Sequence, residues 1–274
     1  MTTLDNVPLK LAIHFKTVRK LGICAAGTLL IMSGGACKKA VEAPPPTPSE
    51  RPTAELVAEA DQLYAQRTDL VKVRQGLITL RQAMVSNSAN YDVAWRVAKF
   101  NYYLGAHSPN DSEKEKAFHD GIGAGKLAVQ LNNDRPDGHF WLGANYGGNA
   151  EMSTLAGFSD IEDIQREMET VIKLDEGYEA GSAYLGLGQT YLKAPRLLGG
   201  DTNKAISYLE KGLKIGPNNG LLRLRLAEAY VQANRNDDAR KQIETLLSMK
   251  PMPGYEAEYN DAVEQARKLQ EKIK

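Results

Sequence analysis

The sequence predicts an all-α protein, an α-solenoid of about five helical hairpins followed by a C-terminal capping helix. One observation is a pentapeptide that occurs twice, as Leu-Gly-Gln-Thr-Tyr from Leu187 and as Leu-Ala-Glu-Ala-Tyr from Leu226. The other is a constant spacing of 34 residues between matching landmarks behind each copy. These matched pairs are Ala205 and Ala239, Leu209 and Ile243, and Pro217 and Pro251. Recurrence at this period is typical of stacked helical repeats.

The motif has the form of a tetratricopeptide (TPR) repeat, which pairs two helices in about 34 residues. Its leucine and tyrosine lie three or four residues apart, so they share one face of the first helix. A small residue, Gly188 or Ala227, lets the second helix approach closely. Pro217 then ends that second helix, because proline lacks the backbone N–H. Stacked hairpins of this kind form a superhelix with a concave face.

The remaining elements follow in order from residue 53. Thr53 is a plausible N-cap for a first helix, and residues 70–85 form its partner. The aromatic spacing of the motif returns from Trp95, with residues 113–132 as the second helix of that pair. The pentapeptide itself returns from Leu142. We therefore expect a TPR-like superhelical domain over 53–254 and a capping helix with a polar outer face over 255–274.

The N-terminal region has the pattern of an export signal. Basic residues precede an apolar run that is too short for a stable membrane span, and small residues then lead to Cys37. The ending resembles a bacterial lipobox, although Gly34 stands where a leucine is usual. We expect a lipoprotein-type signal peptide over 1–36, a lipid on Cys37, and a proline-rich tether over 37–52. The alternatives are a signal peptide that is cleaved without lipidation and an uncleaved membrane anchor.

Composition argues against several classes of function. The chain of 274 residues has a formal net charge of zero, so it lacks the basic excess of a nucleic-acid-binding protein. Its two cysteines and four histidines show no metal-ligand spacing. No catalytic nucleophile–base set is recognisable, and the glycine-rich run at 121–126 lacks the spacing of a phosphate loop. We expect no enzyme activity, no cofactor and no metal, and a helix with small packing residues at 121–126.

Three apparent insertions follow the tyrosines of successive hairpins, at 105–111, 147–158 and 193–201. Insertions at equivalent places are expected on one edge of the superhelix, where repeat proteins often bind partners. Tolerated surface loops are the alternative interpretation. The candidate partner-binding residues of these loops are Gly147, Gly148, Pro195, Leu197 and Leu198.

The concave face supplies a second set of candidates. Positions just after the early aromatic residue of each first helix, and one and two turns later, are expected to face inward. The ligand-binding candidates selected in this way are Arg96, Phe100, Tyr103, Phe140, Gln189 and Lys193. An aromatic lining with a few convergent polar groups suits a small organic anion. In this interpretation Arg96 and Lys193 supply the positive charge.

The chain also resembles a known family over roughly residues 90–250. It combines a lipoprotein-type TPR body with the segment Tyr-Leu-x-Ala-Pro-x-x-x-Gly-Gly-Asp, which begins at Tyr191. In these features it is similar to the TatT proteins, the T component associated with tripartite ATP-independent periplasmic (TRAP) transporters. The resemblance implies a periplasmic, lipid-anchored protein that forms trimers and meets a substrate-binding P component. The expected function is an accessory role in organic-acid uptake, by binding a small solute or the P component. The alternative is an envelope scaffold for protein–protein interaction without a small ligand, and sorting rules favour the outer membrane over the inner one.

Overall fold

The computed structural model describes residues 50–152 and 157–273. All described residues belong to one compact unit. The expected signal peptide over 1–36, Cys37 and most of the tether lie outside the described residues. Those expectations therefore remain predictions.

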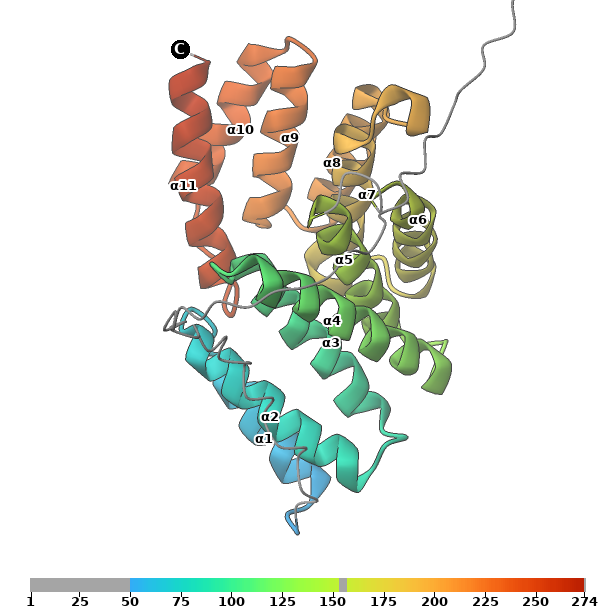
Figure 1. Ribbon diagram of the computed structural model, residues 1–274. Coiled ribbons are helices and arrows are strands. Elements are labelled where there is room, and N and C mark those ends of the chain that lie inside the picture. Colours follow the sequence, from blue (N-terminus) through green and yellow to red (C-terminus); the bar gives the residue numbers. More distant parts are fainter. Residues whose placement is uncertain (1–49, 153–156, 274) are drawn as a thin grey trace, which may run out of the picture. The chain divides into compact units, whose positions relative to one another are not determined.

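The described residues form eleven α-helices and two short 3-10 helices (Figure 1). The α-helices are α1 (Thr53–Tyr64), α2 (Leu70–Ser86), α3 (Tyr91–His107), α4 (Asp111–Leu131), α5 (Pro136–Met152), α6 (Gly157–Leu174), α7 (Ser182–Lys193), α8 (Thr202–Ile215), α9 (Gly220–Gln232), α10 (Asn236–Ser248) and α11 (Glu256–Lys272). The 3-10 helices are η1 (Tyr178–Gly181) and η2 (Arg196–Leu198).

Consecutive helices pack as five hairpins, α1 with α2, α3 with α4, α5 with α6, α7 with α8, and α9 with α10. The first helices also pack in series, α3 on α5, α5 on α7, and α7 on α9. Helix α11 packs against both α9 and α10. The predicted all-α solenoid of five hairpins with a C-terminal capping helix is confirmed.

Polar residues determine where several helices begin. The side chains of Asp69, Asn90, Asn110, Asp201 and Asn219 each accept a hydrogen bond from a backbone N–H in the first turn of the following helix. Such caps satisfy donors that have no partner within the helix. The expected cap at Thr53 is wrong, because Pro52 precedes the helix and Thr53 is its first residue.

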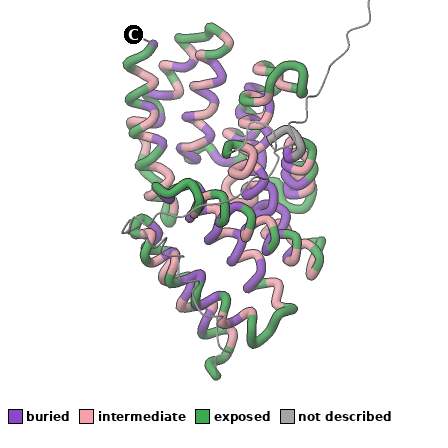
Figure 2. Tube along the Cα trace, viewed as in Figure 1, coloured by how far each residue is buried: buried purple, intermediate pink, exposed green. Residues whose placement is uncertain are grey.

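Small residues let the paired helices approach, as the motif predicts. A Cβ atom on Gly188 of α7 would lie only 2.5 Å from Cγ of Leu209 on α8. Leu209 is fully buried, and so are Leu187 beside that glycine and Ala205 one turn before the leucine. Buried residues recur along the helices in this way, between intermediate and exposed positions (Figure 2).

Two of the three expected insertions begin inside helices rather than in loops. Gly105 lies inside α3, and Gly147 and Gly148 lie inside α5. A Cβ atom on Gly105 would come within 2.7 Å of the Phe118 ring, and one on Gly148 within 2.1 Å. These glycines therefore make room for an aromatic ring from α4, which glycine does by lacking a side chain. The segment 194–201 keeps the predicted character of a loop, with η2 inside it.

A buried histidine–glutamate pair joins the two helices of the third hairpin. Nδ1 of His139 on α5 lies 2.6 Å from Oε2 of Glu167 on α6, and Nε2 lies 3.0 Å from the backbone oxygen of Asn133. Both partners are acceptors, so both ring nitrogens donate when the imidazole is protonated. Burial lowers the pKa of His139, but the hydrogen bonds to Glu167 and Asn133 outweigh it and raise the pKa above its usual value.

This pair predicts a pH-dependent stability. The folded-state pKa of His139 exceeds its unfolded value, so the stabilisation is fully present below the unfolded pKa of about 6.5 and is lost as pH rises through the folded value. We expect the free energy of unfolding to fall as pH rises above about 6.5 and through the folded-state pKa, with a shallower fall in His139→Gln. Urea titrations at several pH values measure this. Replacement of the exposed His119 with Gln is the control, and an unchanged slope in His139→Gln would contradict the prediction.

Candidate functional site: a cavity lined by the first helices

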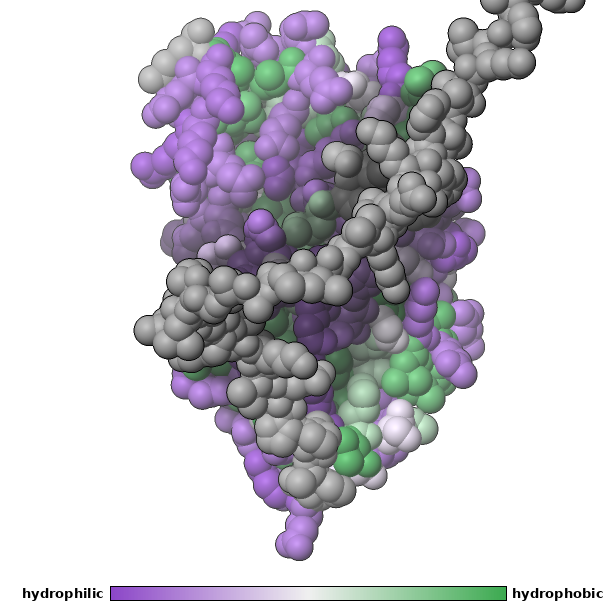
Figure 3. All heavy atoms as spheres, viewed as in Figure 1, coloured by the Kyte–Doolittle hydropathy of each residue, from purple (hydrophilic) through white to green (hydrophobic). Residues whose placement is uncertain are grey.

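A cavity of about 1120 Å³ lies along the inner side of the hairpins. Its wall is formed mainly by the first helix of every hairpin, α1, α3, α5, α7 and α9, together with α11, and residues of α4 and α6 add to it. In the space-filling view the described surface is hollowed near its centre (Figure 3). Because every repeat contributes, the lining combines residues from about 60 to 265 in the chain.

Helix α11 closes the cavity by contacting the first hairpin. Arg67, in the turn after α1, forms two hydrogen bonds with the carboxylate of Glu258, at 3.0 Å and 2.5 Å. The same guanidinium donates to the backbone oxygen of Gly254 at 2.6 Å. Arg67 is only 7% exposed, and burial lowers its pKa, but the hydrogen bonds and charge of Glu258 outweigh this and raise it. His107 of α3 adds a contact of 3.2 Å with Asp261. We call the contact between Arg67, Gly254 and Glu258 the clasp.

Aromatic side chains form much of the cavity wall. They are Tyr64, Trp95, Tyr102, Tyr103, Phe118, Phe140, Trp141, Tyr255 and Tyr259. The chain has two tryptophans, and both line the cavity. Flat apolar surfaces of this kind bind the apolar body of an organic ligand. Tryptophan fluorescence therefore reports on the cavity.

The charged groups of the lining balance each other. Five are basic, namely Arg67, Arg96, Lys99, Lys193 and Arg225. Five are acidic, namely Asp61, Glu151, Glu179, Glu258 and Asp261. A balanced lining gives no net attraction for an anion.

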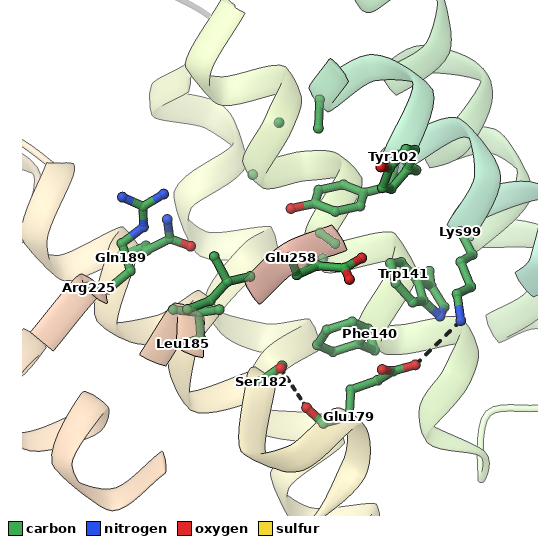
Figure 4. A pocket seen from close by; sticks show the side chains of 18 of the residues that line it. Lys99, Tyr102, Phe140, Trp141, Glu179, Ser182, Leu185, Gln189, Arg225 and Glu258 are labelled. Atoms are coloured by element: carbon green, nitrogen blue, oxygen red, sulfur yellow. Dashed lines mark hydrogen bonds and ion pairs between the residues drawn. The ribbon is translucent and has the colours of Figure 1, made fainter. Parts of the chain in front are cut away.

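Most of these basic groups are closely paired. Nε of Arg96 lies 2.9 Å from Asp61, and Nζ of Lys193 lies 2.5 Å from Glu151. Nη1 of Arg225 lies 2.8 Å from Glu228. Lys99 differs, because its Nζ is 3.7 Å from Oε1 of Glu179, beyond hydrogen-bond length. The view in Figure 4 shows Lys99 and Glu179 across from each other, near Trp141 and Phe140.

Glu179 is held in an unusual backbone conformation. Glu179 and Ala180 have φ values of 47° and 54°, and Gly181 follows with 75°. Left-handed conformations at non-glycine residues cost roughly 1–3 kcal/mol and often occur at functional sites. Asn219 holds the segment by donating to the Ala180 backbone oxygen at 3.2 Å, and Ser182 donates to that of Glu179 at 2.6 Å. The side chain of Glu179 is thereby presented to the cavity.

Five of the six ligand-binding candidates line the cavity, Arg96, Tyr103, Phe140, Gln189 and Lys193. Phe100 does not, because it is fully buried and its ring lies against Gly76 of α2 and Tyr64. It follows Lys99 by one residue, which turns its side chain about 100° around the helix. Arg96 and Lys193 do not offer free positive charge, because each is bound to a carboxylate. That these residues bind a ligand stays a prediction.

The partner-loop candidates are placed apart from one another. Gly147 and Gly148 form part of the cavity wall on α5, and Pro195 lies at the edge of the same cavity. Leu197 is 98% exposed and Leu198 is 39% exposed, both in the loop between α7 and α8. Only the two leucines therefore remain available as an external contact surface.

Several lining residues are not among those that the sequence predicts, above all Lys99, Trp141, Glu179, Tyr255 and Glu258. Lys99 could have been found, because it lies one turn after Trp95 on the same helix face. Tyr255 and Glu258 could not have been found from the sequence. They line the cavity only because the C-terminal segment packs back against the first hairpin.

In residues 50–152 and 157–273, no group of three or more histidine, cysteine or acidic side chains is placed to hold a metal ion. Within the same ranges, no helix is long and apolar enough to cross a membrane.

Comparison with known proteins supports the repeat architecture. Residues 196–265 match the tetratricopeptide repeat family, and residues 56–187 match a family described as regulator of microtubule dynamics protein 1-3. The structure is similar to TTC0263, a thermophilic TPR protein of Thermus thermophilus, with a TM-score of 0.58, 20% identity, and coverage of 77% of this chain and 99% of that chain. It is also similar to MamA protein, with a TM-score of 0.46, 16% identity, and coverage of 80% and 96%. No curated protein sequence matches the chain.

The five observed hairpins, the repeat match at 196–265 and the likeness to TTC0263 agree with one another. Repeat proteins of this architecture use an extended concave surface for binding. Their usual role is in protein–protein interaction rather than catalysis. The chain is thus a TPR-fold protein, of a class typical of interaction scaffolds.

Proposed function

We propose that this TPR-fold protein binds a small, partly apolar organic solute in its central cavity. The observation that carries the proposal is the lining itself, in which aromatic side chains from the first three hairpins and from the α11 segment face one common space. Cavities that hold small molecules are typically concave, largely apolar and furnished with a few polar groups. The volume of about 1120 Å³ leaves room for such a solute.

We further propose that the protein works at the periplasmic side of a membrane as an accessory component of TRAP-type solute uptake. The support is the sequence resemblance to the TatT proteins and the lipobox-like ending at Cys37. A lipid on Cys37 would tether the domain and bring the cavity near a substrate-binding P component, with trimer formation as a further part of the proposal. Mass spectrometry of the mature N-terminus tests the lipid, and an unmodified or uncleaved N-terminus would refute it.

Fluorescence tests the cavity. Anilinonaphthalene sulfonate, an aromatic dye with one negative charge, is expected to bind saturably and to receive excitation energy from Trp95 and Trp141. Ala144→Leu, which places a larger side chain on the cavity wall, should weaken dye binding by tenfold or more. The matched control is Ala58→Leu on the exposed side of α1. Equal dye affinity in the two variants, or no saturable binding by the parent protein, would contradict the proposal.

A protein-interaction scaffold is the second candidate function. The loop between α7 and α8 favours it, since the side chain of Leu197 is 98% exposed in the described structure and Leu198 beside it is 39% exposed, so a partner can cover both. Failure of the dye experiment would leave this loop as the candidate contact surface. Loss of binding to a defined partner in Leu197→Ser, with the fold intact by circular dichroism, would then support it.

A further inference from the structure

Lys99 is the loosely paired basic group of the cavity. Arg67, Arg96, Lys193 and Arg225 each lie within 3.0 Å of a carboxylate oxygen. The Lys99 ammonium lies 3.7 Å from Glu179, and within the part of the chain that the structure describes no group accepts a hydrogen bond from it. An ammonium group carries three donors. Lys99 thus holds hydrogen-bonding capacity that a ligand can use.

Aromatic rings hold the Lys99 ammonium at this place. Its Nζ lies 4.7 Å from the Tyr64 ring centre and 5.1 Å from that of Trp141. Rings at such distances attract a cation through their negative faces. The lysine is only 22% exposed, so its charge is directed toward the cavity rather than into bulk solvent.

Glu179 offers the complementary group. Its Oε2 atom accepts a hydrogen bond from the Tyr255 hydroxyl. Burial and the neighbouring Glu179 charge raise the pKa of Tyr255, so this hydroxyl stays a donor at neutral pH. The other oxygen, Oε1, faces Lys99 and accepts no hydrogen bond from any described residue. The pair therefore presents one positive and one negative group, 3.7 Å apart, whose facing atoms form no hydrogen bond with any described residue. Each group is fixed by a second contact.

We propose that Lys99 and Glu179 recognise a zwitterion of the amino-acid type with an apolar side chain. The ligand carboxylate accepts from Lys99, and its ammonium group donates to Oε1 of Glu179. Because the two protein groups are 3.7 Å apart, the ligand must carry its two charges on one carbon atom, not at opposite ends of a chain. Its apolar body lies beside Phe140 and Leu185, which line the same part of the cavity (Figure 4).

The balance of charge in the cavity agrees with this ligand class. The lining has as many acidic as basic side chains, so a ligand without net charge enters without a net electrostatic penalty. A simple organic anion would place its single charge beside both Lys99 and the negatively charged Oε1 of Glu179. This inference rests on the proposed function and names its ligand class.

Three compounds of matched shape test the inference on the unaltered protein. L-Phenylalanine carries both charges, hydrocinnamate lacks the ammonium group, and phenethylamine lacks the carboxylate. Hydrogen bonds to charged groups contribute enough to change affinity by about tenfold or more. We expect L-phenylalanine to displace the bound dye, or to release heat in calorimetry, at concentrations at least tenfold below either analogue. Equal affinity of hydrocinnamate and L-phenylalanine would overturn the zwitterion and leave organic-acid binding intact.

Two variants assign the two charges. Glu179→Gln should abolish the preference for L-phenylalanine over hydrocinnamate, and Lys99→Gln should abolish the preference over phenethylamine. Lys116→Gln is the control, because Lys116 lies outside the cavity lining in an exposed pair with Asp120, and it should keep both preferences. Dye binding without displacement by any of the three compounds overturns the zwitterion alone. Absence of dye binding to the parent protein overturns the proposed function and the inference together.

Discussion

Gly188→Leu is expected to lower the free energy of unfolding by about 3 kcal/mol, because an overpacked core forces side chains and backbone apart. Gly188 lies on α7 at the contact with α8, where even a Cβ atom would come within 2.5 Å of Leu209. Leu209 is fully buried and cannot turn into solvent. Urea unfolding followed by circular dichroism measures the loss, and Gly188→Ala should give a smaller loss in the same direction.

Gly123→Ala is the matched control for this experiment. Gly123 also lies within a helix, α4, but a Cβ atom there meets nothing within 4 Å. Alanine lowers the entropy of the unfolded chain and favours the helix, so this change should stabilise the protein by about 0.5–1 kcal/mol. If the free energy of unfolding falls in the Gly188 variants and rises in Gly123→Ala, packing and not helix propensity determines the effect of substitution at Gly188. An unchanged free energy of unfolding in Gly188→Leu would show that Gly188 does not lie at the contact between α7 and α8.

Arg67→Met is expected to release α11 from the first hairpin and to cost about 3 kcal/mol, because it leaves the carboxylate of Glu258 without its partner. The clasp joins residues that are 191 positions apart, and its guanidinium is almost fully buried. Hydrogen exchange of α11 measures local release, and urea unfolding measures the loss of stability. Dye binding should weaken in parallel, because α11 forms part of the cavity wall.

A double variant separates charge from packing in the clasp. Arg67→Met with Glu258→Leu removes both charges, and buried ion pairs replaced by apolar residues of similar volume often lose little stability. We expect it to recover part of the loss, since the hydrogen bond to Gly254 stays absent. Lys268→Ala in the exposed pair with Glu264 is the control and should change stability by less than about 1 kcal/mol. If Arg67→Met changes neither the free energy of unfolding nor the hydrogen exchange of α11, the clasp does not hold α11.

The glycines show where sequence reasoning failed and why. Gly105, Gly147 and Gly148 follow motif tyrosines at places where an insertion fits the repeat period, so a loop is the simple interpretation. In the structure all three are helical. Gly105 and Gly148 make room for the ring of Phe118, which belongs to a different helix. Glycine lowers helix propensity by about 1 kcal/mol, a cost that close packing between helices can outweigh. Local sequence carries no sign of which distant ring will occupy such a space.

The sequence by itself determined the repeat architecture. Motif copies around Tyr191 and Tyr230, spaced landmarks and closing prolines are local signals, because each hairpin is built from neighbouring residues and each stacks on the next. The same periodicity placed Arg96, Tyr103, Phe140, Gln189 and Lys193 on the inner face.

Tertiary structure alone decided how the inner face is closed and how its charges are paired. The clasp brings α11 back to Arg67, and the left-handed backbone at Glu179 and Ala180 turns a carboxylate toward Lys99. These contacts join residues separated by 80 positions in one case and 191 in the other, across several repeats. A repeat period describes the relation of each hairpin to its neighbour, whereas the accumulated rotation that brings the last helix to the first hairpin depends on packing at every interface between them.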